Sequence, residues 1–271
     1  MPELPEVETT RRGLAPHVRG RRIVALELYE RRLRWPVPAG LPRALRGQRI
    51  VAAGRRGKYL LLELRDGTLL VHLGMSGNLR LTPRHSPRAS HDHFDLVLDS
   101  GVALRFNDPR RFGSLHYTRG DPLRHPLLKD LAPEPFARSF DDPYLWGITR
   151  RRRVAIKQLL MNSRLVVGVG NIYASEALFR ARIRPRRQAR SLTRAEAARL
   201  TRAVRTVLAQ AIRAGGTTLR DYLGADGAPG YFRQRLHVYE RAGRPCRRCG
   251  SAVRALTQGQ RSTYYCPSCQ K

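Results

Sequence analysis

The four cysteines of the chain constrain its last 26 residues more than any other feature. They form two close pairs, "CRRC" and "CPSC", with 16 residues between the pairs: Cys246, Cys249, Cys266 and Cys269. This spacing predicts a tetrahedral zinc ribbon whose second pair returns on a β-hairpin, whereas two disulfides would require an oxidising compartment. Four protein ligands leave no open coordination position, so the predicted zinc is structural. The hairpin "ALTQGQRSTYY" would present Arg261 near its tip, where it suits a phosphate.

The charge balance predicts a polyanionic partner. The 271 residues contain 52 Lys plus Arg against 21 Asp plus Glu, a formal charge of +31. Nucleic acid is favoured over membrane because the basic residues are spread along the whole chain. No apolar run approaches 18 residues and no signal peptide is visible, so we expect a soluble, intracellular protein. Of only four lysines, Lys58 and Lys157 lie in patterned segments and are candidates for an amine that exchanges its proton; a salt-bridge role is the alternative.

The first half of the chain has the pattern of an antiparallel β domain. After a short amphipathic helix opened by Pro5 (5–14), seven short segments bounded by turn residues are predicted as strands: 22–29, 49–54, 58–64, 68–73, 94–98, 102–106 and 114–118. No helical pattern lies between them, so a sandwich or barrel is favoured over a parallel sheet. The basic, proline-rich stretch 82–91 is predicted as a loop.

The second half changes to a helical period. Helices are predicted over 151–162, 171–183 and 193–216, and "GADGAPGYF" (224–232) as a mobile loop. Thr193 and Glu196 form a capping box at the start of the third helix, and Gly215 ends it. In "VVGVGN", two glycines precede a helix that begins at Asn171, which indicates either an anion site at a helix N-terminus or an ordinary helix-turn-helix corner.

Several loops carry side chains suited to DNA. "HLGMSG" and "DPRRFG" follow strands, so Met75, Arg110 and Phe112 either project as wedges and base readers or pack in the core. "HDHFD" contains His91, for which phosphate contact or a structural role is favoured over a second metal site. No G-x-S-x-G, H-E-x-x-H or Walker-type loop occurs, which disfavours serine-hydrolase, zincin and P-loop chemistry.

The chain opens "MPELPEVETT", with a proline directly behind the initiator methionine. Removal of Met1 would leave Pro2 as a terminal secondary amine beside Glu3. Such an amine attacks a sugar's anomeric carbon to give an iminium ion, which acts as an electron sink. A neighbouring glutamate moves protons during ring opening. Pro2 is therefore a sensible nucleophile for DNA glycosylase and lyase chemistry.

Together these features resemble the formamidopyrimidine-DNA glycosylase family. The resemblance runs from "MPELPEVET" through "HLGMSG", "HDHFDLVL", "DPRRFG", "VVGVGNIYASE" and "GGTTL" to "CRRC" and "YYCPSC". It implies an α+β multidomain chain: an N-terminal antiparallel β-sandwich with an N-terminal helix (1–131), a helix-two-turns-helix domain with a mobile lesion-binding loop (132–236) and a C-terminal zinc-ribbon finger (237–271). DNA would lie in the cleft between the two halves.

The implied function is that of a bifunctional DNA glycosylase and AP lyase of base-excision repair. The enzyme would remove oxidised purines, 8-oxoguanine and formamidopyrimidines, from duplex DNA through a Schiff base on its N-terminal proline. It would then cleave the strand by β,δ-elimination. The resemblance also implies one structural Zn²⁺, no organic cofactor, no membrane partner, a monomer and a cytoplasmic location at the nucleoid.

Site residues follow by the same resemblance. The catalytic residues would be Pro2 as nucleophile, Glu3 as acid/base, Lys58 as proton donor in β-elimination and Arg261 in δ-elimination. DNA would be bound by His72, Met75, His91, Arg110, Phe112, Arg152 and Asn171, with Met75, Arg110 and Phe112 filling the space left by the extruded base. The damaged base would be surrounded by Lys157, Thr217 and Tyr222.

Two alternatives stay open. The related endonuclease VIII branch, which prefers oxidised pyrimidines, typically has glycine where Leu4 stands here and lacks the Met/Arg-x-Phe trio. A noncatalytic zinc-ribbon protein that binds DNA or RNA would explain the charge and the cysteines, but not Pro2 and Glu3 together with Lys58. Ala132 departs from the glycine expected in relatives, which affects local loop geometry only.

Overall fold

The computed structural model describes residues 2–217 and 232–271, which fall into two compact units. Unit 1 comprises 1–129 and 212–233, and unit 2 comprises 130–211 and 234–271. The three-domain partition drawn from the sequence stays a prediction. In the part of the chain that the structure describes, no helix has the length and apolar character needed to cross a membrane.

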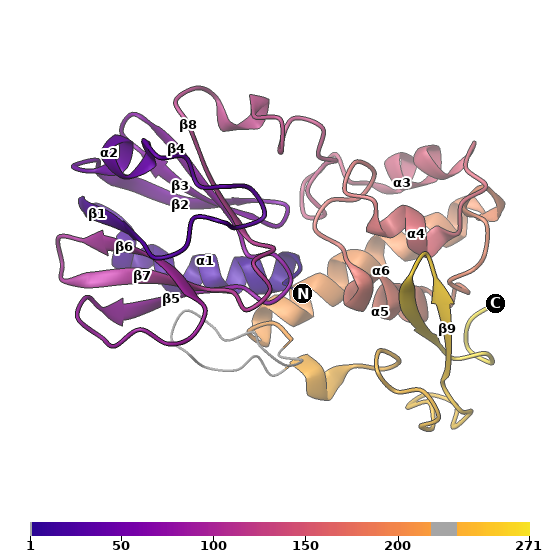
Figure 1. Cartoon of the computed structure of the whole chain (residues 1–271). Coiled ribbons are helices and arrows are strands. Elements are labelled where there is room, and N and C mark those ends of the chain that lie inside the picture. Colours follow the sequence, from indigo (N-terminus) through magenta and orange to yellow (C-terminus); the bar gives the residue numbers. More distant parts are fainter. Residues whose placement is uncertain (1, 218–231) are drawn as a thin grey trace. The chain divides into compact units, whose positions relative to one another are not determined.

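Two four-stranded antiparallel sheets form unit 1 (Figure 1). The first has the order β1-β6-β7-β5 and the second β2-β3-β4-β8. Their strands are β1 (Ile23–Leu28), β2 (Ile50–Arg56), β3 (Tyr59–Leu64), β4 (Gly67–His72), β5 (Asn78–Pro83), β6 (Asp92–Leu98), β7 (Val102–Asn107) and β8 (Ser114–Thr118). The predicted antiparallel sandwich is therefore confirmed.

Apolar residues of both sheets share one core, because strand side chains alternate between the two faces of a sheet. The core includes Leu60, Leu62 and Leu64 of β3 and Leu96 and Leu98 of β6. The predicted N-terminal helix is α1 (Leu4–Val18), longer than expected, and it packs on β2 and touches β3 and β5. A short α2 (Leu41–Leu45) and the 3-10 turn η1 (Pro122–Arg124), neither of them predicted, complete the elements of unit 1 before residue 130.

Unit 2 combines helices with a terminal hairpin. Its elements are α3 (Asp142–Thr149), α4 (Ile156–Met161), α5 (Asn171–Ala181), η2 (Ala189–Ser191), α6 (Arg194–Arg213), η3 (Phe232–Arg235), β9 (Arg254–Gln258) and β10 (Arg261–Tyr265), of which α6 and η3 cross the boundary with unit 1. The capping box of α6 is confirmed: the N–H of Glu196 donates to Thr193 Oγ1 at 3.2 Å, and the N–H of Thr193 donates to Glu196 Oε2 at 2.8 Å. The fold class predicted from the sequence is the one observed.

Among the differences from the prediction, two come from long-range pairing. The helix expected from 151 begins at Ile156, because Ala155 pairs with Gln188 as an isolated bridge and Val154 accepts a hydrogen bond from the N–H of Ala189. The stretch 82–91, expected to be a loop throughout, opens with the end of β5, whose Pro83 pairs with Val102. Proline is tolerated there because β5 is an edge strand.

Candidate active site and zinc centre

The N-terminal residues of α1 are held by a buried carboxylate that the sequence analysis did not single out. Glu6 Oε2 accepts a hydrogen bond from the N–H of Glu3, and Glu6 Oε1 accepts one from the N–H of Thr217, both at 2.8 Å. Pro2 and Glu3 are themselves buried. The spacing of Glu3 and Glu6, three residues apart at a helix start, is the capping-box signal that would have identified Glu6.

Helix α1 and strand β2 run antiparallel, so the start of α1 and the end of β2 lie on the same side. Arg55 Nε of β2 donates to Glu8 at 3.2 Å, and Arg11 donates to the carbonyl of Ala53 at 3.2 Å. Earlier residues of α1 thus face later residues of β2. Pro2 and Glu3 lie toward the β2–β3 turn, where Lys58 stands.

Glu8 is the charged centre of this helix–strand contact. Burial acts to raise the pKa of Glu8, but hydrogen bonds from Arg11 and Arg12 and the nearby charges of Arg11 and Arg55 outweigh it and lower the pKa to about 2. Glu8 therefore stays ionised at every physiological pH and keeps the helix docked on the strand.

His72 lies beside Lys58 at the ends of paired strands. Tyr59 pairs with His72 across β3 and β4, so Lys58, the residue before Tyr59, lies next to His72. The centroids of the Tyr59 and His72 rings are 4.7 Å apart. Burial, together with the positive charges of Lys58 and Arg34, lowers the pKa of His72 from 6.5 to about 4. Because the N–H of Gly74 donates to Nδ1 at 3.0 Å, the neutral ring carries its proton on Nε2. His72 thus offers an uncharged N–H donor, which suits a phosphate oxygen.

A single buried carboxylate organises the two loops that carry the predicted wedge residues. Asp108 Oδ1 accepts from Ser76 Oγ at 2.6 Å and from the N–H of Arg110 at 3.3 Å, and Oδ2 accepts from the N–H of Gly113 at 2.8 Å. The loops around Met75 and Phe112 are therefore fastened to each other. Asp108 is fully buried, and no pattern in the sequence distinguished it from a turn residue.

The wedge residues themselves reach the surface. Phe112 is 42% exposed, and the Arg110 guanidinium carbon lies 4.9 Å from the centroid of its ring. Met75 is partly exposed, and Arg110 is exposed. An exposed phenylalanine beside an arginine in a rigid turn has the chemistry needed to enter a base stack and hydrogen-bond a base edge.

The loop before β6 is braced by a buried ion pair. Arg105 donates to both oxygens of Asp95, at 2.9 and 2.7 Å, and to the carbonyls of Ser86 and Pro87, at 3.1 and 2.8 Å. His91, at the end of this loop, is exposed and has a left-handed φ of 68°. Asp95 faces Arg105, and the ring of His93 forms a hydrogen bond with the carbonyl of Asp108 at 2.7 Å. Asp95 and His93 are therefore engaged in structural contacts.

A second group of predicted residues lies in unit 2, around the buried amine of Lys157. Nζ donates to Asn171 Oδ1 at 2.6 Å, to Thr263 Oγ1 at 2.7 Å and to the carbonyl of Ser262 at 3.1 Å. Asn171, the first residue of α5, donates in turn to the Ser262 carbonyl at 3.0 Å. Helices α4 and α5 are thus tied to strand β10 of the hairpin.

The hairpin presents Arg261 immediately after its turn. Gly259 and Gln260 both have positive φ, 55° and 58°, the geometry of a two-residue type I′ turn. Arg261 is exposed at the start of β10, opposite Gln258. A Cβ on Gly259 would lie 2.7 Å from Gln158 Nε2, so the hairpin tip approaches α4 closely. Arg152 precedes α4 and donates to the carbonyl of Ile148 at 2.9 Å.

The four cysteines form a structural zinc site. Their sulfur atoms all lie within 4.8 Å of one another, the spread expected of ligands around one tetrahedral Zn²⁺ with bonds of about 2.3 Å. Backbone N–H groups of Arg248 and Cys269 donate to Cys246 and Cys266 sulfur, each at 3.4 Å. These donors suit thiolate ligands rather than neutral thiols. In the described part of the chain, no other cluster of His, Cys, Asp and Glu could hold a metal ion.

The predicted residues are divided between the two units. Unit 1 holds Pro2, Glu3, Lys58, His72, Met75, His91, Arg110, Phe112 and Thr217, and unit 2 holds Arg152, Lys157, Asn171 and Arg261 with the zinc ligands. Tyr222 and residues 224–231 of the predicted loop lie outside the described residues. Besides Glu6 and Asp108, sequence reasoning missed Glu176, whose carboxylate accepts from the N–H groups of His237, Val238 and Tyr239.

The chain matches three family models in succession. The formamidopyrimidine-DNA glycosylase N-terminal domain matches residues 1–115, and the formamidopyrimidine-DNA glycosylase H2TH domain matches residues 131–222. The zinc finger found in FPG and IleRS matches residues 243–271.

Individual relatives agree over the full length. Formamidopyrimidine-DNA glycosylase of Methylococcus capsulatus is 55% identical over 271 residues and covers 100% of both chains. Among solved structures, the MutM (Fpg) protein of Thermus thermophilus is 45% identical, with a TM-score of 0.89 over 99% of this chain and 98% of that one.

The Fpg of Lactococcus lactis has been solved with several DNAs. A mutant in complex with Fapy-dG containing DNA is 34% identical, with a TM-score of 0.94 over 100% of both chains. The wild-type protein in complex with oxidised pyrimidine containing DNA is 34% identical, with a TM-score of 0.92 over 100% of both chains. With matching models along its length and relatives above half identity, the chain belongs to the formamidopyrimidine-DNA glycosylase family.

Proposed function

We propose that this chain is a bifunctional DNA glycosylase and AP lyase of base-excision repair that removes oxidised purines from duplex DNA. The observation that carries the proposal is the shared end of α1 and β2. There the Pro2–Glu3 pair lies toward Lys58 and His72 on one side of unit 1. In the proposed reaction Pro2 is the nucleophile, Glu3 the acid/base group, Lys58 a proton donor and His72 a neutral hydrogen-bond donor. Family membership and the DNA complexes of the relatives support duplex DNA as the substrate.

The first half of the reaction exchanges the base for the enzyme amine. Once Met1 is removed, the secondary amine of Pro2 attacks C1′ of the damaged nucleotide. The base leaves with the electrons of the glycosidic bond and takes up a proton, and Glu3 supplies protons for opening the sugar ring. The product is an iminium ion that joins Pro2 to C1′. The iminium nitrogen has no proton to lose, so it stays positively charged.

The second half breaks the strand. The iminium makes the C2′ proton acidic, and its removal expels the 3′ phosphate; loss of the 5′ phosphate follows in δ-elimination. Lys58 and Arg261 would assist by proton donation and by charge, and His72 would hold a phosphate oxygen through its neutral Nε2–H. The zinc takes no part, because four cysteine ligands complete its coordination.

Base extrusion requires groups that fill the vacated space in the duplex. Phe112 and Met75 would occupy it, and Arg110 would face the orphaned base, since arginine recognises a base edge through directed hydrogen bonds. The hydrogen bonds that Asp108 accepts hold these loops in place before DNA binds, which lowers the ordering cost of insertion.

Borohydride trapping tests the proposal directly. Borohydride reduces the iminium to a stable covalent adduct, so Met1-free protein is incubated with an 8-oxoguanine·cytosine duplex and, in parallel, with an oxidised-pyrimidine duplex. We expect an adduct mapped to Pro2 that forms faster on the oxidised purine. Faster trapping on the pyrimidine would reassign the substrate class. The pyrimidine duplex is included because the Lactococcus lactis protein has been solved with oxidised pyrimidine containing DNA. No adduct from protein of verified mass would refute the lyase mechanism.

A matched variant separates chemistry from binding. Pro2→Gly replaces the secondary amine with a primary one and removes the ring, so base removal should fall sharply while duplex affinity changes little. Retention of Met1, verified by intact mass, should have the same effect. Normal excision by either protein would contradict the assignment of Pro2 as nucleophile.

A further inference from the structure

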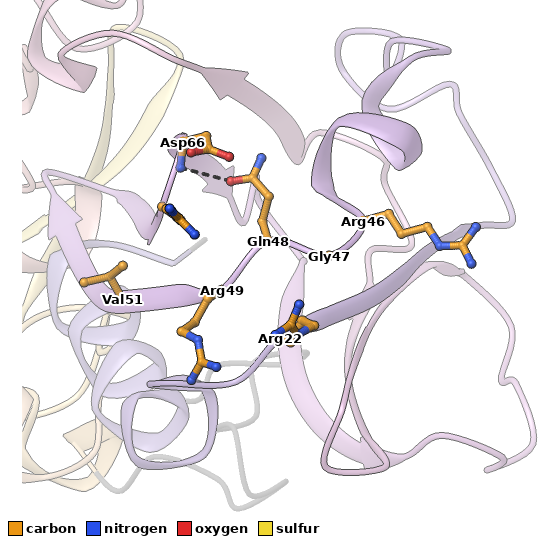
Figure 2. Close-up of a pocket in the computed structure, with 8 residues that line it drawn as sticks. Arg22, Arg46, Gly47, Gln48, Arg49, Val51 and Asp66 are labelled. Atoms are coloured by element: carbon orange, nitrogen blue, oxygen red, sulfur yellow. Dashed lines mark hydrogen bonds between the residues drawn. The ribbon is translucent and has the colours of Figure 1, made fainter.

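An open pocket lies where the two sheets of unit 1 join, away from the groups described above. Its volume is about 660 Å³, and its lining includes four arginines, Arg22, Arg46, Arg49 and Arg65 (Figure 2). The join is built from backbone hydrogen bonds of 2.8 Å, from the N–H of Ile23 to the carbonyl of Gln48 and from that of Ile50 to the carbonyl of Arg21. Arg22 and Arg49 pair across it as an isolated antiparallel bridge.

This pocket and the candidate active site occupy opposite ends of the same strands. Strand β2 begins at Ile50, beside the pocket, and runs to Arg56, just before Lys58. Seven residues of strand span roughly 23 Å. The β3–β4 turn that carries Arg65 lies at the pocket end, and His72 ends β4 at the other. The pocket is therefore a separate site on the unit and shares no residue with the proposed chemistry.

The pocket's positive charge is not neutralised by the protein. All four arginines are exposed, and Asp66 supplies the one carboxylate of the lining. Within the described residues, no ion pair joins any of the four to a carboxylate, in contrast to Arg55 or Arg105 elsewhere in unit 1. Like charges directly opposite each other on paired strands destabilise the pair, which is the position of Arg22 and Arg49. A bound anion would remove that repulsion.

The backbone under the arginines is rigid. Gln48 donates to the Ala44 carbonyl at 2.7 Å and to Tyr117 Oη at 2.9 Å, and its Oε1 accepts from the N–H of Asp66 at 3.2 Å. These bonds tie α2, β8 and the β3–β4 turn together at the pocket. Val51 also lines the pocket and is 53% exposed. Its side chain has no polar atom, so the arginines would bind an anion.

The shape of the cluster distinguishes among anions. Figure 2 shows the side chains of Arg46 and Arg49 directed apart, so their guanidinium groups do not converge on one point. Divergent donors suit successive phosphates of an extended polyanion better than one small phosphate. The lining contains no aromatic side chain, whereas single-stranded nucleic acid is held largely by base stacking on aromatic rings. A duplex, whose backbones present rows of phosphates at its surface, fits the cluster best.

We propose that this arginine cluster binds the phosphate backbone of a second DNA duplex, so that one chain holds an undamaged segment in addition to the one at its active site. The contact is sequence-independent, because the cluster offers guanidinium groups to phosphates and nothing to base edges. The inference rests on the proposed function in taking duplex DNA as the partner. It would let the enzyme pass between neighbouring segments without releasing both.

The test compares two triple variants with equal loss of charge. The pocket variant is Arg22→Gln, Arg46→Gln and Arg65→Gln; Arg49 is retained because it donates to the Gly20 carbonyl. The control variant is Arg138→Gln, Arg180→Gln and Arg186→Gln, three exposed residues of unit 2. Sedimentation velocity with excess short undamaged duplex measures the number of duplexes bound per chain at low salt. If the pocket triple fails to fold, Arg46→Gln with Arg65→Gln replaces it and leaves the Arg22–Arg49 bridge intact.

We expect two duplexes per chain for the wild type and the control variant, and one for the pocket variant. In the wild type, log affinity for the second duplex should fall against log salt with a slope of about −0.9 for each phosphate that the cluster neutralises. One duplex per wild-type chain, or equal losses in the two variants, would overturn the proposal. Full competition by inorganic phosphate at low millimolar concentration would do so as well, by showing a small-anion site.

Excision and borohydride trapping on a lesion duplex are measured separately for all three proteins. Both variants should retain the wild-type rate, since neither alters a group placed in the chemistry. A failure of trapping would contradict the proposed function. The number of duplexes bound per chain would still test the second site, because that measurement does not depend on catalysis.

Discussion

The carboxylate of Glu6 supports the first residues of α1 by accepting two backbone hydrogen bonds, one from Glu3 and one from Thr217. In Glu6→Gln the amide retains one acceptor and turns an N–H₂ toward the other donor, so one buried N–H loses its partner. Leaving such a group unsatisfied costs about 1–3 kcal/mol. We expect the lost hydrogen bond to misalign Pro2, so kcat for excision should drop about tenfold or more, while KM for the duplex changes little.

Steady-state excision on an 8-oxoguanine duplex measures this split between kcat and KM. Glu63→Gln, which makes the same change at an exposed position of β3, is the control and should behave as wild type. An unchanged kcat in Glu6→Gln would show that the carboxylate does not align the nucleophile.

His72 makes stability depend on pH. Its pKa is lowered to about 4 in the folded protein, so the unfolded chain, with a value near 6.5, binds the proton first as pH falls. The stability that His72 contributes should therefore be fully present above about pH 6.5 and be lost as pH falls toward 4. Urea denaturation of wild type and His72→Gln across this window should show the wild type losing its advantage, on the order of 3 kcal/mol. A difference that stays constant with pH would refute the assignment.

At the scale of an element, the loop after β7 depends on Asp108, which fastens it to the loop after β4. Asp108→Asn places an N–H₂ group where Oδ1 or Oδ2 accepts from an N–H, so at least one of the three bonds is lost. We expect looser wedge loops and a fall of about tenfold in affinity for a duplex with an abasic site, with a smaller effect on undamaged duplex.

Fluorescence anisotropy with the two duplexes compares these affinities. Asp99→Asn, at an exposed turn of the same sheet, is the control. Equal losses on both duplexes would point to misfolding rather than to loose wedges.

Lys157 joins helix α4 to helix α5 through Asn171, and to the zinc-finger hairpin through two acceptors, the Ser262 carbonyl and Thr263 Oγ1. Lys157→Met keeps the volume but removes the ammonium donors to Asn171, Ser262 and Thr263, of which Thr263 is buried. Breaking such a network should cost about 2–4 kcal/mol and expose the β9–β10 amides to hydrogen exchange, with zinc content unchanged. Thr263→Val, which removes a single acceptor, should give a smaller effect; equal protection in wild type and Lys157→Met would contradict the joining role.

At the scale of the whole molecule, unit 1 and the zinc finger of unit 2 differ in what makes them stable. Unit 1 has a large apolar core between its sheets, whereas the finger shares a small cluster: Phe179, Val238, Cys246, Val253 and Cys266. So small a core is insufficient without metal, and binding zinc is part of its folding. Chelation, or Cys249→Ser, should unfold the finger and leave unit 1 intact. Circular dichroism with zinc analysis would test this, and a finger still folded without zinc would contradict it.

Features that depend on neighbouring residues were predictable from the sequence. Two C-x-x-C pairs define a zinc site, Thr193 and Glu196 cap α6, and alternating apolar runs form most of the strands, because each pattern is satisfied within a few residues. Strand β5 was missed because its middle carries Arg80 and its end is Pro83; pairing with β7 stabilises it. Ala155 is extended rather than helical for the same kind of reason, its pairing with Gln188.

The sequence by itself determined the fold class and the family, since both follow from the spacing of residues within short segments of the chain. Only the tertiary structure decided which buried carboxylates hold the site and which arginines stay unneutralised. Glu6 and Thr217 are 211 residues apart along the chain, and Lys157 and Thr263 are 106 apart. No local pattern specifies such partners, because a hydrogen bond or an ion pair depends on distance in space, which folding alone establishes.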